Sequence, residues 1–190
     1  MPDLGSFHIL INHFPVILTL VGAVAVLLAL VIRTRTVWLY ATATLALAGL
    51  SAIPTFLTGD PAEDQLEDSW YVTRRAIETH SDAADFALWG LIIMGVIAAY
   101  AWWRAWRLTV VVVEATQTER GNIVADPMVR TNAGLPVWLR ALVLVSALNG
   151  SALVIRTASL GGDILHRSEI LKTTPRPASV PAPAAEPGER

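Results

Sequence analysis

The chain has 190 residues, 54% of them hydrophobic, and a positive mean hydropathy, a composition typical of proteins that cross a membrane several times rather than of soluble domains. Its formal net charge of −2 argues against nucleic acid as a partner, because a polyanionic backbone is normally met by a basic surface. Cysteine is absent, which excludes disulfides, iron–sulfur ligation, a thiolate zinc site and covalent c-type haem attachment.

Four stretches of the chain are long and apolar enough to cross a bilayer. A hydrocarbon core about 30 Å thick needs roughly 20 helical residues. Three of the stretches carry no charge, and the fourth is interrupted only by Arg156. We therefore expect an all-α fold, an integral membrane four-helix bundle that occupies residues 1–172. Its helices are predicted at about residues 14–32, 37–59, 80–106 and 138–162.

Pro15 is expected either to start the first helix or, if the helix begins earlier, to kink it. A kink would free the carbonyl of Ile11, because proline has no N–H to donate to it. In the fourth helix, Ser146, Gly150 and Ser151 form a small-residue face that allows close contact with another helix.

Two segments are predicted to lie outside the bundle. Residues 108–136 begin with Val110–Val113, which either extends the third helix or forms a short strand, and then become polar without a clear period. Residues 173–190 contain five prolines together with alanine and serine. This composition cannot bury a core, so we expect a disordered or extended tail.

Arginines close to the helix ends predict the orientation in the membrane. Five of them flank the two odd-numbered links between helices, which places those links in the cytoplasm. Both termini and the acidic loop at residues 60–85 then face the periplasm, across a bacterial inner membrane. Four basic residues on the other side weaken the bias. The five are Arg33, Arg35, Arg104, Arg107 and Arg140, and the four are Arg74, Arg75, Arg167 and Lys172.

All four histidines lie at the ends of apolar runs, on the predicted outer side. His8 and His13 precede the first run, His80 precedes the third, and His166 follows the fourth. On a regular helix His8 and His13 would point about 140° apart, so they would not share one ligand face. The spacing therefore favours two sites, or one ligand and one supporting group. For His8 and His166, near the aqueous edge, a solvated or interfacial histidine without a special role is the simpler interpretation. For His13 and His80 a function is favoured, because polar groups near the membrane core are costly and tend to serve a purpose.

Arg156 needs an anionic partner or a route to the interface, because a guanidinium inside an apolar helix is costly. It lies on the outer half of the fourth helix, where it could reach Asp85. It could equally hold an anionic cofactor group, such as a haem propionate. Arg74 and Arg75 could serve similarly from the outer loop.

Four short segments stand out in chain order: His8-Ile-Leu-Ile-Asn-His13-Phe14-Pro15, Thr58–Glu63, Glu78–Ala84 and Leu160–His166. Together they resemble the successive signatures of the bacterial membrane family catalogued as domain of unknown function 2231. The resemblance implies a small four-helix inner-membrane protein that associates with redox proteins, because some relatives are joined to Rieske iron–sulfur domains. This chain has no Rieske part, and it carries a longer link between helices 3 and 4 than the family pattern.

The leading hypothesis is a membrane-embedded b-type cytochrome or cytochrome-like electron carrier, with haem b held between the outer helix ends. His13 and His80 are the predicted axial ligands of the haem iron. His8 and His166 would form a second pair or support the first. Arg156, with Arg74, would neutralise propionates. The expected partners are the lipid bilayer and a redox protein in the membrane or periplasm.

Two alternatives stay open. A copper or zinc site would use the same histidines, completed by Asp82, Asp85 or Asp163. A structural or assembly subunit would hold no cofactor, and the histidines would line a polar cavity. Enzymatic activity is not indicated, because the sequence offers no nucleophile with a base and no phosphate-binding glycine loop.

Overall fold

The computed structural model describes residues 4–59, 72–118 and 135–172, and within these ranges all regular structure is helical. Four of the helices are long and apolar enough to span a membrane, which confirms the predicted all-α, multi-pass character. The predicted tail and most of the predicted loop and insertion lie outside the described residues. The helices are α1 Leu4–Ile11, α2 His13–Ile32, α3 Arg35–Leu57, α5 Arg74–Thr118 and α7 Val137–Lys172.

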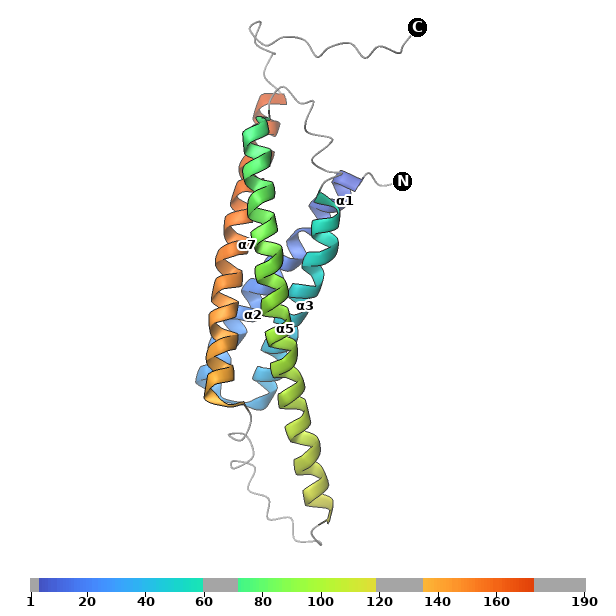
Figure 1. The fold of residues 1–190 in the computed structure, drawn as a ribbon, viewed down its shortest axis with the longest axis vertical. Helices are drawn as coiled ribbons and strands as arrows, with labels where there is room; N and C mark the ends of the chain where they lie inside the picture. The colour runs from blue at the N-terminus through green and yellow to red at the C-terminus, as the bar shows by residue number, and fades with distance from the viewer. Residues whose placement is uncertain (1–3, 60–71, 119–134, 173–190) are drawn as a thin grey trace, which may run out of the picture.

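The four long helices form an antiparallel bundle (Figure 1). Each helix packs against the next along the chain, and α7 returns to contact α2, which closes the ring. The short helix α1 lies against α2 and α3. Consequently α1, the C-terminal end of α3, the N-terminal end of α5 and the C-terminal end of α7 all lie toward one end of the bundle, with α1 and α3 set apart from α5 and α7 (Figure 1).

Helices α5 and α7 are longer than the sequence predicted. We expected the third helix to begin near residue 80, after a loop, but it begins at Arg74 and continues through Val110–Val113 to Thr118. Helix α7 continues past Gly162 to Lys172. The prediction located the helices from their uncharged runs and extended them by only a few residues. The added first turns of α5 expose Arg74, Arg75 and Glu78 and bury Ile77 on the opposite side.

Helix α1 is separated from α2 by a break at Asn12, three residues before Pro15. The chain is thus helical before Pro15, which is the second of the two predicted options. In a regular helix the Ile11 carbonyl would accept a bond from residue 15. The Thr55 hydroxyl of α3 lies 3.4 Å from that carbonyl oxygen instead. That hydroxyl also lies 3.0 Å from the Ser51 carbonyl oxygen of its own helix, so the Ile11 carbonyl receives the longer arm of a shared hydrogen bond.

Small residues let the helices approach closely. A Cβ atom added to Gly49 would lie 2.6 Å from the Leu91 carbonyl oxygen and 2.9 Å from the Cα atom of Gly95, so α3 and α5 touch through their backbones. Gly150 of α7 likewise lies against the Met94 sulfur, as its small-residue pattern predicted. This packing through small side chains is typical of helices in lipid, where large apolar residues can stay on the outside. Large exposed apolar side chains include Val31, Leu50, Phe86, Trp89 and Val145.

Candidate functional site

His8 of α1 is held by the C-terminal end of α3. Its Nδ1 atom lies 3.1 Å from the Thr55 carbonyl oxygen and 3.1 Å from the Thr58 hydroxyl oxygen. A carbonyl can only accept, so Nδ1 carries the proton and Nε2 keeps its lone pair. Histidines that ligate metals are commonly oriented by this kind of second hydrogen bond. The half-buried His8 ring is therefore positioned with one nitrogen available to a ligand.

His80 of α5 is half-buried, and its Nδ1 atom is buried without a hydrogen-bond partner among the described residues. The ring packs against Gly161 of α7, where an added Cβ would lie only 3.0 Å from its Cε1 atom. The backbone of Thr157, one turn earlier on α7, interacts with the same ring. Gly161 thus permits the close approach of the His80 ring, and the helix continues past it to Lys172.

The two imidazoles of His8 and His80 lie close enough to interact electrostatically. They come from α1 and α5, and the supporting residues come from α3 and α7, so the ends of four helices build one site. No single segment of sequence carries this constellation. Chemically, it offers two imidazole groups, each contributing a nitrogen that no protein group occupies.

His13 and His166 are placed differently. His13 is the first residue of α2; it is exposed, and its Nδ1 atom lies 2.9 Å from the Ile9 carbonyl oxygen in its own chain segment. His166 is exposed near the end of α7, five residues beyond Gly161. Of the other histidines, His8 and not the predicted His13 interacts electrostatically with His80. Depth along the helix axis could be estimated from the sequence, but the direction of each ring could not.

The predicted arginine contacts are only partly formed. Arg156 is exposed and makes no ion pair with any described residue; the expected pair with Asp85, itself exposed, is not formed. Arg156 directly precedes Thr157, so its backbone lies at the level of the His80 ring. Arg74 pairs with Glu78, with an Nε–Oε1 distance of 3.1 Å, and both side chains are largely exposed. Such a solvated pair contributes little stability, but it already engages the Arg74 guanidinium.

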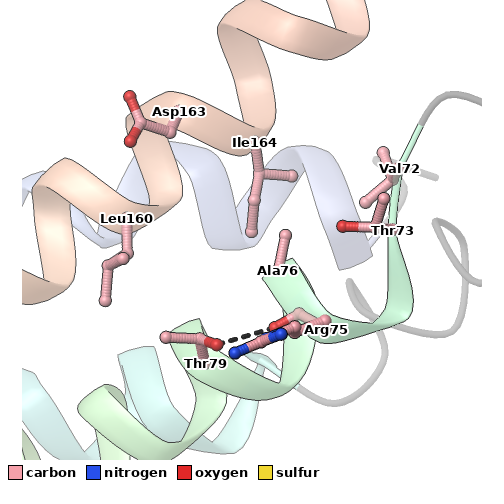
Figure 2. Close-up of a pocket in the computed structure, with 8 residues that line it drawn as sticks. All are labelled: Val72, Thr73, Arg75, Ala76, Thr79, Leu160, Asp163 and Ile164. Carbon is pink, nitrogen blue, oxygen red and sulfur yellow. Dashed lines mark hydrogen bonds between the residues drawn. The ribbon is translucent and has the colours of Figure 1, made fainter.

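A pocket of about 280 Å³ adjoins the site, between the first turns of α5 and the end of α7. Figure 2 shows Leu160 and Ile164 of α7 across from Ala76 and Arg75 of α5, with the Asp163 carboxylate directed away from Arg75. The lining residues Thr79 and Leu160 immediately precede His80 and Gly161 in the chain. The Arg75 side chain therefore lies at the same end of the bundle as the imidazoles, in a pocket that neither histidine lines.

Within the described part of the chain, no three His, Asp or Glu side chains are grouped closely enough to share a metal ion. Asp82, Asp85 and Asp163 are exposed and do not join the imidazoles. Sequence reasoning missed the supporting roles of Thr55 and Thr58. The available signal was their spacing. Residues three apart at the end of a helix lie on the same face, and both threonines lie at the end of the second apolar run.

No known protein family, curated protein or solved structure matches the chain. Its function must therefore be argued from the site.

Proposed function

We propose that the protein is a membrane-embedded, b-type cytochrome-like electron carrier that binds haem between His8 and His80. The observation that carries the proposal is the convergence of these two imidazoles at one end of a four-helix bundle. Paired histidines on facing helices are a common way for bundles to hold haem. The axial pair differs from the one that depth alone predicted, because His13 is turned to its own backbone.

The chemistry of the donors supports this assignment. The Thr55 carbonyl and Thr58 hydroxyl hold His8 in the tautomer that leaves Nε2 free. A buried nitrogen without a partner, as at Nδ1 of His80, costs about 1–3 kcal/mol, and a ligand bond would offset this cost. Gly161 lets the His80 ring sit against α7 without a side chain between them.

Positive charge near the imidazoles supports an anionic cofactor. Arg156 has no acidic partner among the described residues, and Arg75 lines the adjoining pocket. Either guanidinium could hold a propionate through paired hydrogen bonds. Arg74 is the weaker candidate, since Glu78 already engages it. Bound haem would supply reversible one-electron chemistry, while the bundle would hold its ligands and keep water from them.

The surroundings of the carrier are part of the same proposal. The arginine bias supports a bacterial inner membrane with the histidine end toward the periplasm, where a redox partner would meet it. The resemblance to the family called domain of unknown function 2231 supports association with redox proteins, because some relatives in that family are fused to Rieske domains. The quoted motifs contain the site residues His8, Thr58, His80 and Gly161.

Absorption spectra of the freshly purified protein, before and after dithionite, test the proposal. We expect a Soret band and sharp α and β bands on reduction. His8→Ala and His80→Ala should each abolish or strongly alter these bands, because each removes an axial ligand. His166→Ala is the matched control and should leave them unchanged, since that ring is exposed beyond the site.

Other outcomes select other functions. Unchanged spectra in both the His8 and His80 variants would overturn the ligand pair, and loss of the bands in His13→Ala but not in His8→Ala would restore the original pair. Bound copper or zinc without haem bands, found by elemental analysis, would favour the non-haem metal site. Absence of both haem and metal would favour a structural or assembly subunit.

A further inference from the structure

Five arginines whose side chains the structure describes gather at the end of the bundle opposite the histidines. This end comprises the turn between α2 and α3, the segment of α5 near Ala105 and the first turn of α7. The acidic side chains that the structure describes, from Glu78 to Asp85 and at Asp163, belong to the histidine end. The described arginines at the opposite end are Arg33, Arg35, Arg104, Arg107 and Arg140.

Two of these arginines are brought onto one face by their contacts. Arg35 of α3 points its Nε donor at the Ala105 carbonyl of α5, at 3.4 Å. Arg140 of α7 lies over the Trp38 ring of α3, 6.0 Å from its centroid. Trp38 follows Arg35 by three residues, so the two share one side of α3. Three helices therefore converge on a small region that contains Arg35 and Arg140, both half-buried.

Arg140 forms no ion pair with the part of the chain that the structure describes. Its Nε atom is buried and has no hydrogen-bond partner among the described residues. Guanidinium stays charged in proteins, so the site cannot relieve this cost by losing a proton. The α3 helix begins at the same place, and Thr34 provides no side-chain cap for its free N–H groups. Unpaired donors, a positive helix end and two arginines together favour an anion.

We propose that Arg35 and Arg140 bind the phosphate diester of an anionic phospholipid. Guanidinium groups match phosphate oxygens through paired hydrogen bonds, and basic pockets between membrane helices bind anionic headgroups. The apolar side chains beside the site are exposed, including Tyr40, Val137 and Trp138, so acyl chains can lie along the bundle from there. Tryptophan at this level is typical of the layer of lipid headgroups. This site is independent of the histidine site and of its cofactor.

Lipid titration of the full-length protein in neutral detergent tests the assignment, with bound lipid measured by native mass spectrometry. We expect dioleoyl phosphatidylglycerol to bind in preference to dioleoyl phosphatidylcholine. Arg35→Gln and Arg140→Gln should each weaken phosphatidylglycerol binding about fivefold, the effect of one basic residue near a headgroup. Arg107→Gln is the matched control: it removes the same charge at the same end, but its exposed guanidinium rests on Trp103 of its own helix.

The control should bind phosphatidylglycerol as the unmodified protein does. Equal weakening in Arg107→Gln would mean diffuse attraction to anionic lipid and would overturn the site. Equal binding of the two lipids by the unmodified protein would also overturn it. Inorganic phosphate is a further arm: if it displaces phosphatidylglycerol, the site takes a free anion and the lipid assignment is wrong. Should Arg140→Gln fail to fold, Arg35→Gln against Arg107→Gln decides the question.

Discussion

Two adjacent glycines on α7 differ sharply in what surrounds them. A Cβ atom added to Gly161 would lie 3.0 Å from Cε1 of His80 and 3.5 Å from its Nδ1, whereas one added to Gly162 would meet nothing within 4 Å. Helix propensity alone would favour alanine at both positions. The absence of a side chain at Gly161 therefore serves the imidazole beside it.

We predict that Gly161→Ala displaces the His80 ring and lowers the haem content or shifts the reduced absorption bands. Gly162→Ala should keep the spectrum and gain up to about 1 kcal/mol of stability from helix propensity. Pyridine haemochrome assays and reduced spectra of the two variants provide the comparison. Identical spectra in Gly161→Ala and the unmodified protein would show that this contact does not position a ligand.

In the middle of the bundle, close contact between helices also depends on glycines, which have no side chain. Gly49 of α3 faces backbone atoms of Leu91 and Gly95 on α5, which cannot move without separating the helices. A Cβ atom added to Gly22 of α2 would first meet a side chain, at 2.6 Å from Cδ2 and 2.8 Å from Cγ of Leu45, with the nearest backbone atom at 3.3 Å. Both positions are glycines inside apolar helices, but an added methyl group would meet backbone atoms at Gly49 and a side chain at Gly22.

Gly49→Ala should therefore destabilise the bundle by about 1–3 kcal/mol, the usual cost of overpacking a filled interior. Gly22→Ala should cost less, because the end of a flexible side chain gives way more easily than backbone. Unfolding in mixed detergent and SDS, followed by tryptophan fluorescence, measures both. An equal or smaller loss for Gly49→Ala would contradict close backbone contact between α3 and α5.

For the molecule as a whole, the antiparallel arrangement puts α1 and the end of α7 on one side of the bundle and the end of α5 on the other (Figure 1). The chain has no native cysteine, so single introduced cysteines report their own position only. Ser6 and Ser168 mark the histidine end, and Thr118 marks the opposite end.

We expect cysteine variants at Ser6 and Ser168 to react with an impermeant maleimide in intact cells with a permeabilised outer membrane, and the variant at Thr118 to stay unlabelled until the cells are lysed. This result follows from the arginine bias at the α2–α3 and α5–α7 links. The reverse pattern would place the histidine site in the cytoplasm and require a cytoplasmic redox partner.

The sequence by itself determined that the protein is a membrane protein and how many helices span the membrane. It also determined that the histidines share one end of the bundle. These properties depend only on the length of the apolar runs and their order in the chain. The sequence also indicated the break around Pro15 and the small-residue contacts of α7. Its estimate of helix ends failed at Arg74 and beyond Gly162, where charged, amphipathic turns continue the helices outside the apolar runs.

Only the tertiary structure decided which groups hold each histidine. His13 lies against the Ile9 carbonyl of its own segment, while His8 contacts Thr55 and Thr58 from α3, and these partners cannot be identified from spacing alone. The same holds for Arg156, whose expected partner Asp85 is left unpaired. Apolar length sets how deep a residue lies, but helix rotation and close packing at single glycines set what its side chain faces.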